Sequence, residues 1–391
     1  MHVAYLHYLM ASDTAVHHVR QFADAARALG HRVDVHALNL AESGAPGGGG
    51  PSLRRRFREV VKRRFARYLH EPKELMWNLP YRRRERELLR SGAPDVLLVR
   101  NGWLKASFVG SAREAGVPLV LEVNSPAAEA RLYDRKYAHL PLVAERLEGW
   151  KLHRAERVVV VSAALRDYLA ARHSVPLEKF VVTPNGADEA RFRPDVEPDP
   201  LVLERLGNGP IIGFVGSFER WHGIDLLATM AREVASLRPE ARFLFVGDGP
   251  DRALVNELQS ELGDRLLCTG RVPHDRVPGL VAAMTVGVMP ESNFYGSPLK
   301  VIEWMAAGLA LVAPAYGPLC EVVDHGVHGL LFEPREPDSL VACVVRLIDE
   351  PELRTELGRR AASRVGRSLT WKHNAHRVLD ACRLASMPAE R

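Results

Sequence analysis

One segment, residues 293–308 (NFYGSPLKVIEWMAAG), combines several features of an anion-binding helix start. Ser297 can cap a helix, and Pro298 suits its first position because the missing N–H of proline would be unpaired there anyway. The backbone N–H groups of Leu299 and Lys300 then face outward together with the positive end of the helix dipole. Lys300 adds a full positive charge, which opposes that dipole and therefore favours an anionic partner. The segment predicts a site for a phosphate-like group.

Glu303 lies one helical turn beyond Lys300 and on the same face. Its carboxylate can accept two hydroxyls of a ribose while Lys300 and the helix start hold a diphosphate. An ordinary surface ion pair between Lys300 and Glu303 is the alternative interpretation.

A second candidate follows the apolar run at residues 211–215. The run leads into Gly216, where the backbone can approach a ligand closely. Arg220 and His222 come on the loop before the next helical segment, and arginine can bind phosphate oxygens in a bidentate manner. A plain strand-to-helix turn with a solvent-facing arginine remains the alternative.

Other loops also follow predicted strands. Residues 246–250 (VGDGP) and 270–274 (GRVPH) are expected at the lip of a nucleotide cleft. In the first half of the chain, Asn124 and Ser125 can contact a sugar or can cap the helix that follows. His18 follows the first strand and either faces a ligand or begins a helix.

Short apolar runs alternate with helical patterns along the chain, which is typical of parallel sheets covered on both faces. The sequence therefore predicts an α/β protein with two doubly wound Rossmann-like domains facing across a cleft. Helices are expected at residues 16–29, 224–237 and 299–307. Strands are expected at residues 3–6, 33–36, 96–99, 119–123, 158–161, 180–182, 211–215, 243–246, 286–289, 309–313 and 330–332.

Residues 193–200 (RPDVEPDP) form a stiff, charged connector and are the predicted domain boundary. We expect an acceptor-side domain at residues 1–193 and a nucleotide-sugar domain at residues 194–370. A C-terminal helix at residues 371–391 is expected to pack back on the first domain.

A basic amphipathic insertion is predicted near residues 53–90. Arginines and lysines from Arg54 to Arg67 alternate with apolar residues at helical spacing, and a second arginine cluster covers residues 82–90. The pattern predicts a helix that touches an anionic membrane surface. A solvated helix that packs on the domain edge is the alternative.

The composition is that of an ordinary globular protein: 391 residues, 47% hydrophobic, 26% charged and a net charge of +5. The four cysteines have neither metal-clip nor redox spacing, so reduced thiols in the cytoplasm are expected and no metal is required. The first ten residues read as a strand rather than a signal peptide, and no apolar run is long enough to span a membrane.

Taken in order, these stretches resemble the family 4 retaining glycosyltransferases, which have the GT-B fold. The resemblance runs nearly from end to end. It rests on residues 29–33 (LGHRV), 158–162 (VVVVS), 183–188 (TPNGAD), 215–223 (VGSFERWHG), 246–250, 270–274, 300–308 and 321–329 (EVVDHGVHG). Each piece is short, but their common order is specific.

The resemblance implies a reaction and a set of roles. Arg220 and Lys300 would bind the diphosphate of a nucleotide-sugar donor, Glu303 its ribose, and the loop of Arg271 and Val272 its nucleobase. Transfer would retain the anomeric configuration without an enzyme nucleophile, since the leaving diphosphate helps to deprotonate the acceptor. The acceptor would be a sugar or other small molecule, a lipid-linked acceptor or a cell-envelope polysaccharide. The remaining donor-side residues would be Gly216, Ser217, His222, Gly247, Tyr295, Gly296, Ser297, Pro298 and Leu299.

Some positions depart from the family pattern. The first of two glutamates usually found eight residues apart is Tyr295 here, which puts sugar identity or activity in question, and Glu291 is a possible substitute. Ser217 stands where an arginine is usual and His222 where a lysine is usual. Asn124 occupies a site that is often histidine.

Three other classes fit parts of the pattern. Tyr295 favours a catalytically silent nucleotide-sugar-binding protein, which would bind donor without product release. A nucleotide-sugar epimerase on the same fold would need no acceptor. The arginine clusters alone suggest a nucleic-acid-binding protein, but no recognised nucleic-acid motif accompanies them, so no nucleic-acid partner is expected.

Overall fold

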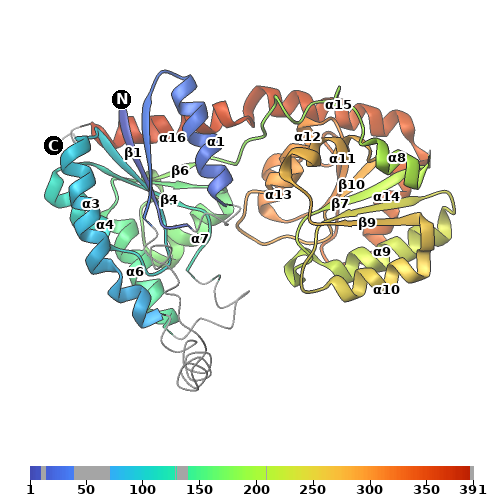
Figure 1. Ribbon diagram of the computed structural model, residues 1–391, viewed down its shortest axis with the longest axis horizontal. Helices are drawn as coiled ribbons and strands as arrows, with labels where there is room; N and C mark the ends of the chain where they lie inside the picture. The colour runs from blue at the N-terminus through green and yellow to red at the C-terminus, as the bar shows by residue number, and fades with distance from the viewer. Residues whose placement is uncertain (10–14, 39–70, 128, 130–139, 208, 388–391) are drawn as a thin grey trace, which may run out of the picture. The chain divides into compact units, whose positions relative to one another are not determined.

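A computed structural model describes residues 1–9, 15–38, 71–127, 129, 140–207 and 209–387 (Figure 1). The predicted basic helix from Arg54 to Arg67 lies outside the described residues. The chain divides into two compact units. Unit 1 comprises Met1–Val161, Leu165–Thr183 and Ala375–Arg391, and unit 2 comprises Ser162–Ala164 and Pro184–Asn374. The proline-rich residues 193–200 belong to unit 2.

Unit 1 is built on a six-stranded parallel sheet in the order β2-β1-β3-β4-β5-β6. Its four central strands are largely buried on both faces, as a sheet covered on both sides requires. The helices are α1 (Ala15–Ala28), α3 (Asn78–Gly92), α4 (Ser107–Ala115), α6 (Pro141–Arg154) and α7 (Ala163–His173). The strands are β1 (His2–His7), β2 (Arg32–Ala37), β3 (Val96–Arg100), β4 (Leu119–Val123), β5 (Arg157–Val160) and β6 (Phe180–Val182).

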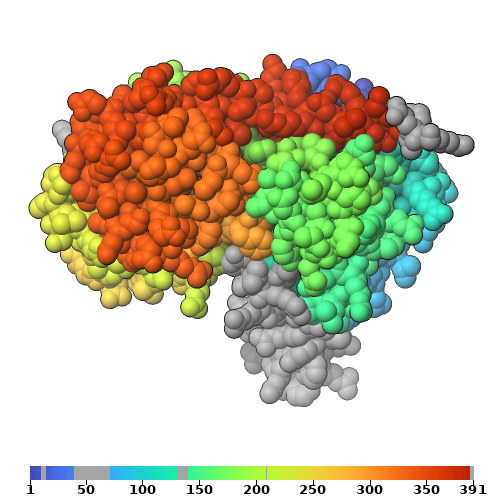
Figure 2. Space-filling view, turned by 180° about the vertical axis from the view of Figure 1, so that it is seen from behind, coloured from blue at the N-terminus to red at the C-terminus, as the bar shows by residue number. Residues whose placement is uncertain are grey.

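The C-terminal helix α16 (Trp371–Ser386) contributes to the core of unit 1. From Ala375 onward its buried residues, including Val378 and Leu379, share a cluster with Val3 and Val96 of the sheet. The outer side of this helix lies at the molecular surface (Figure 2). Packing of an apolar stripe on the sheet therefore stabilises the last helix.

Unit 2 has a second six-stranded parallel sheet, in the order β12-β11-β10-β7-β8-β9. One core cluster packs α9 (Ile224–Leu237), α10 (Arg252–Leu262) and α14 (Pro337–Asp349) on one face. The other face carries α8 (Pro200–Leu206), α11 (Val277–Ala282), α12 (Leu299–Ala306), α13 (Gly317–Val322) and α15 (Pro351–Ser368). The strands are β7 (Ile211–Val215), β8 (Arg242–Val246), β9 (Leu266–Gly270), β10 (Val286–Val288), β11 (Ala310–Pro314) and β12 (Leu330–Phe332). The predicted doubly wound α/β architecture is confirmed.

Strand β9 is absent from the predicted set. It lies at the edge of the sheet, and only the first of its five residues is fully buried. An edge strand needs few apolar side chains, so the run LLCTG carries too little hydrophobic signal to be recognised from sequence.

Part of the second arginine cluster is neutralised within unit 1. Arg82 and Arg86 of α3 both pair with Glu114 of α4, while Arg83, Arg84 and Arg90 are exposed. Within the described part of the chain, every helix is too short or too polar to cross a membrane.

Each sheet has one point where the strand order reverses. In unit 1, β2 lies on one side of β1 and β3 on the other, so the order reverses between β1 and β3. In unit 2, β8 lies on one side of β7 and β10 on the other, so the order reverses between β7 and β10. Ligands of open α/β sheets bind outside the carboxyl ends of the strands at such switch points. The two reversals therefore mark where sites are expected.

Candidate functional site

The switch point of unit 2 brings Lys300 of α12 onto the loop that follows β7. A Cβ atom built on Gly216 would lie 2.5 Å from the Lys300 Nζ, so any other residue at this position would displace the lysine ammonium. The ammonium also lies 4.7 Å from the ring centroid of Phe214, within range of a cation–π interaction. Gly216 and Lys300, predicted separately from sequence, are thus brought together.

The uncharged imidazole ring of His222 contacts this lysine and orients its ammonium. Desolvation, followed by the nearby charge of Lys300, lowers the pKa of His222 to about 4. The His222 Nδ1 lies 2.6 Å from the carbonyl oxygen of Ser217, to which a neutral ring must donate. The Nε2 lone pair is then left to accept from the Lys300 Nζ, 3.4 Å away.

Lys300 retains capacity for an anion. Desolvation lowers the pKa of its ammonium to about 7, and the charge of Glu303 opposes that shift. Both residues are described, and no ion pair joins them. The surface ion pair considered above is therefore wrong, because Lys300 turns toward Gly216 and His222 instead.

Glu303 is a buried carboxylate, only 9% exposed. Desolvation raises its pKa to about 7, with a raising contribution from Asp188 and lowering contributions from Arg191 and Lys300. Among the described residues no group donates a hydrogen bond to it. An unbonded buried carboxylate is costly, so Glu303 is poised to accept donors such as hydroxyls.

The start of α12 differs from the prediction. Ser297 does not cap the helix, because its Oγ accepts a hydrogen bond from the backbone N–H of Asn185 at 3.0 Å. Pro298 takes the N-cap position without a side-chain cap, and the helix begins at Leu299. The Leu299 N–H donates to the Ser297 carbonyl at 3.0 Å. Of the two predicted backbone donors, only the N–H of Lys300 has no partner among the described residues.

The loop before α12 turns Tyr295 inward. Tyr295 is 2% exposed, and its carbonyl accepts from the Ser162 hydroxyl at 2.5 Å. Asn293 Oδ1 accepts from the N–H of Gly296 at 2.5 Å and holds the turn. Tyr295 therefore occupies the interior, where the family's first glutamate would need a charged partner.

Glu291 is already engaged. Its carboxylate pairs with Arg335 at 3.2 Å and accepts from the Ser292 N–H at 3.0 Å. A Cβ on Gly223 would lie 2.7 Å from the Glu291 Cβ, so the residue packs against the start of α9. These contacts compete with any role of Glu291 as a substitute for the missing glutamate.

Backbone contacts join the loops after β7, β8 and β9. The Gly216 N–H donates to the Val246 carbonyl at 2.9 Å, and the Gly247 N–H donates to the Gly270 carbonyl at 3.0 Å. A Cβ on Gly247 would lie 1.8 Å from the Gly216 oxygen, so this approach requires glycine. The close packing fixes the loop that carries Lys300's partners.

The remaining predicted residues lie at the edge of this region. Arg220 begins the 3₁₀ turn that ends at His222, and both Arg220 and Ser217 are exposed. Arg220 has no ion-pair partner within the described residues, so its guanidinium is available to an anion. Arg271 is exposed at the end of β9, whereas Val272 packs against the core.

Three neighbours of Glu303 and Ser297 are not among the site residues predicted from the sequence. Asn185 binds Ser297, while Asp188 and Arg191 act on Glu303. All three follow β6 in or next to the stretch TPNGAD. The Pro-Asn-Gly sequence in this stretch is typical of a turn and could have indicated these residues.

In unit 1, Asn124 and His18 gather around one buried ion pair. Arg100 donates to Glu122 at 2.6 Å, and the Asn124 amide donates to the same carboxylate oxygen at 2.6 Å. Desolvation, followed by the charges of Arg100 and His17, lowers the pKa of His18 to about 3. Arg100 and Glu122 were not predicted, because both lie within or beside apolar strands.

Ser125 lies in the bend after Asn124, half-buried. The Ala127 N–H donates to Glu148 at 2.7 Å, and most of the segment that Ser125 would cap lies outside the described residues, so the helix-capping alternative stays open. Within the described ranges, no three histidine, cysteine, aspartate or glutamate side chains converge as metal ligands do.

Two family models match this chain. Glycosyltransferase Family 4 matches residues 15–191, and Glycosyl transferases group 1 matches residues 209–350. The chain belongs to glycosyltransferase family 4. A 2-deoxystreptamine glucosyltransferase of Streptomyces kanamyceticus is 30% identical over 282 residues, which cover 68% of this chain and 71% of that protein. A 2-deoxystreptamine N-acetyl-D-glucosaminyltransferase of Streptomyces fradiae is 29% identical over 318 residues, covering 76% and 73%.

Solved glycosyltransferase structures share the fold. Anabaena HepE in complex with UDP aligns with a TM-score of 0.72 at 17% identity, covering 97% of this chain and 99% of that one. Sucrose-phosphate synthase from Thermosynechococcus elongatus aligns with a TM-score of 0.72 at 20% identity, covering 98% of each. This glycosyltransferase therefore has the GT-B fold.

Proposed function

We propose that this glycosyltransferase moves a sugar from a nucleoside-diphosphate donor to a hydroxyl acceptor and retains the anomeric configuration. Unit 2 would bind the donor and unit 1 the acceptor. The observation that supports this proposal most directly is the environment of Lys300. Its ammonium has an imidazole and an aromatic ring as neighbours, and no carboxylate of the described residues forms an ion pair with it. A diphosphate supplies the missing negative charge.

The roles follow from the geometry of unit 2. Lys300, its backbone N–H and Arg220 would bind the diphosphate and stabilise the negative charge that develops as the glycosidic bond breaks. Glu303 would accept the ribose hydroxyls, and the loop of Arg271 and Val272 would lie against the base. The leaving diphosphate would help to deprotonate the acceptor hydroxyl, so no enzyme nucleophile takes part.

The comparisons support the donor class by analogy. One structural neighbour was solved with UDP-glucose, at 17% identity. The two Streptomyces relatives are named for transfer to 2-deoxystreptamine, which is a small ring with several hydroxyls and not a polysaccharide. A small acceptor is therefore as consistent with the family as the lipid-linked or cell-envelope acceptor expected above.

Donor binding tests the proposal. Lys300→Ala and Glu303→Ala should each weaken binding of the cognate nucleotide by about 1–3 kcal/mol, the cost of losing a charged hydrogen bond. The cognate nucleotide is first found by mass spectrometry, as nucleotide release from UDP-, GDP-, TDP- and ADP-sugars. Isothermal titration then measures affinity, with exposed Lys372→Ala as the matched control. Unchanged affinity in both variants would refute this placement of the site.

A silent binding protein is the second candidate, favoured by the buried Tyr295 where the family has a glutamate. Donor binding without turnover of any sugar would establish it. For an active enzyme, proton NMR of the new glycosidic bond distinguishes retention from inversion.

Membrane attachment through Arg54–Arg67 stays a prediction. Replacement of Arg54, Arg55, Arg56, Arg63 and Arg64 by glutamine should reduce binding to anionic vesicles and leave nucleotide affinity unchanged. Equal vesicle binding by the variant would exclude a membrane role for this segment.

A further inference from the structure

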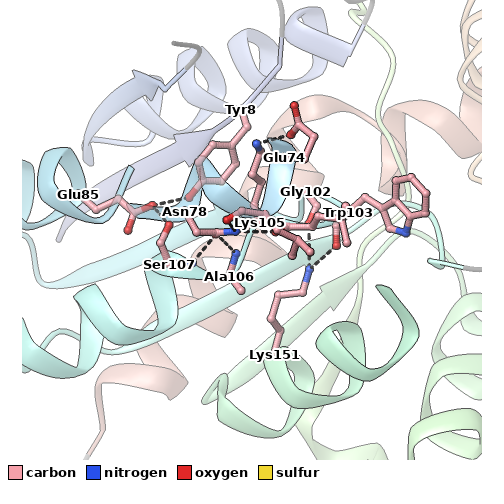
Figure 3. A network of polar contacts seen from close by, with 12 residues as sticks. Tyr8, Glu74, Asn78, Glu85, Gly102, Trp103, Lys105, Ala106, Ser107 and Lys151 are labelled. Carbon is pink, nitrogen blue, oxygen red and sulfur yellow. Dashed lines mark hydrogen bonds and ion pairs between the residues drawn. The ribbon is translucent and has the colours of Figure 1, made fainter. Parts of the chain in front are cut away.

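The loop after β3 in unit 1 is held from two sides (Figure 3). From α3, Asn78 Oδ1 accepts from the Ala106 N–H at 2.8 Å. From α6, the fully buried Lys151 donates from Nζ to Asn101 Oδ1 at 2.5 Å and to the Gly102 carbonyl at 2.9 Å. A buried ammonium is tolerated only when it is hydrogen-bonded, so this loop has one well-defined conformation.

A cavity of about 230 Å³ opens against that loop. It lies at the carboxyl ends of β1 and β3, the switch point of the unit 1 sheet. Pockets for drug-sized ligands have volumes of roughly 300–1,000 Å³, so this smaller β1/β3 cavity suits one ring rather than a chain of sugars. Its lining residues are Tyr8, Leu9, Glu74, Arg100, Asn101, Gly102, Trp103, Leu104 and Lys105.

The cations at the cavity are already neutralised. Arg100 pairs with Glu122 at 2.6 Å, and Lys105 pairs with Glu74. The Lys105 ammonium also lies 4.6 Å from the ring centroid of Tyr81. Because each cation has its own carboxylate, the lining exerts little net attraction on a strongly charged ligand.

Two of the lining residues are aromatic. The Tyr8 hydroxyl is bound to Glu85 at 2.7 Å, so Tyr8 offers the cavity its ring. Trp103 is the other aromatic lining residue. Glu74 and the amide of Asn101 are polar groups at the same wall, able to bind hydroxyls. Apolar walls with a few polar groups are the usual pattern of a small-molecule site.

We propose that the β1/β3 cavity binds the acceptor as a single uncharged, polyhydroxylated six-membered ring, such as a cyclitol or a monosaccharide. The C–H faces of the ring pack on Tyr8 and Trp103, and its hydroxyls bind Glu74 and Asn101. This inference rests on the proposed function, since it assigns the acceptor of the same reaction.

Ligand-observed NMR on the full chain tests it with four rings of similar size. Myo-inositol and methyl α-D-glucopyranoside are uncharged, and comparing them distinguishes a cyclitol from a monosaccharide as the acceptor. Of the charged rings, 2-deoxystreptamine is cationic and inositol 3-phosphate is anionic. Leu9→Trp should fill the cavity and abolish ring binding. Trp103→Ala should weaken it by about tenfold through loss of stacking. Trp150→Ala, on the exposed surface of α6, is the matched control.

The outcomes separate the two proposals. Binding of an uncharged ring that Leu9→Trp abolishes and Trp150→Ala spares supports the inference. Tighter binding of either charged ring, binding that survives Leu9→Trp, or no binding of any ring would overturn it. Nucleotide binding, measured on the same variants, monitors folding through unit 2. If the wild type releases no nucleotide from any donor sugar, the proposed function fails whatever the rings do.

Discussion

Two lysines lie at the switch points of the two sheets and have different surroundings. Lys151 in unit 1 is fully buried and donates to an amide oxygen and two backbone carbonyls. Lys300 in unit 2 has one long contact to His222 and the face of Phe214. Desolvation lowers the pKa of Lys151 to about 8 and that of Lys300 to about 7.

Two glutamates, one in each unit, also differ in how fully their carboxylates are hydrogen-bonded. Glu122 in unit 1 is bonded by Arg100, Asn124 and Tyr5, whereas Glu303 receives no hydrogen bond from the described part of unit 2. In unit 1 the charged groups satisfy one another and build a rigid, neutral wall. In unit 2 they are left unsatisfied, which is what a site for a charged ligand requires. Whether a charged group has hydrogen-bond partners within the protein, more than its residue type, thus distinguishes structural residues from ligand-binding residues.

Replacing each lysine by methionine is the strongest test of this comparison. Lys151→Met should lower the free energy of unfolding by about 3 kcal/mol, since three partly buried acceptors lose their donor. Lys300→Met should change it by less than about 1 kcal/mol, because little is bonded to that ammonium. Urea unfolding measures both, with exposed Lys73→Met as the control. Equal losses in the two variants would contradict the comparison.

Glu303→Gln should change the pH dependence of stability. The folded-state pKa of Glu303 is raised to about 7 from an ordinary 4.5. Between these values the unfolded chain releases the proton while the folded chain keeps it, so this group lowers stability as pH rises from about 4.5 to 7. The variant should lack that loss and be more stable at pH 8 by about 2 kcal/mol.

Urea midpoints at pH 4.5 and pH 8 give the measurement for wild type and Glu303→Gln. Glu122→Gln is the matched control in unit 1 and should be destabilised at pH 8, because it breaks a bonded carboxylate. If Glu303→Gln is destabilised at pH 8 as well, Glu303 has partners that this structure lacks.

His222→Lys should have the smallest effect. The new ammonium would lie close to Lys300 and repel it, costing about 1 kcal/mol of stability. A bound diphosphate relieves that repulsion, so nucleotide affinity should rise by roughly threefold to tenfold. Calorimetry of nucleotide binding checks this, with His222→Gln as the uncharged control. Weaker binding by His222→Lys would mean that His222 accepts from Lys300 in a way that a second cation cannot replace.

Much of the fold could be predicted because parallel strands buried on both faces have continuous apolar runs. All eleven predicted runs coincide with strands of the structure, and the signal is clearest in β3 and β11, in which every residue is buried. The short edge strand β9 was not predicted because it has no such run. Gly216 and Lys300 were recognisable from local chemistry, a strand ending in glycine and a lysine in the first turn of a helix.

The partners of these groups were not predictable. Ser297 reads locally as a helix cap, but Asn185, 112 residues away, takes its hydroxyl. Nothing in the local sequence distinguishes Lys151 from other helical lysines. Its hydrogen-bond acceptors come from a loop about 50 residues earlier in the chain. Arg100 and Glu122 appear as ordinary ends of strands, yet adjacent strands place them in one pair.

The amino-acid sequence by itself determined the alternation of strands and helices, the glycines at the loop crossings and the supply of charged groups, because these depend on neighbours within one or two turns. Tertiary structure alone decided which charges are neutralised and which are left for a ligand. That outcome depends on desolvation and on hydrogen-bond partners from distant segments, and both exist only after the sheets have formed.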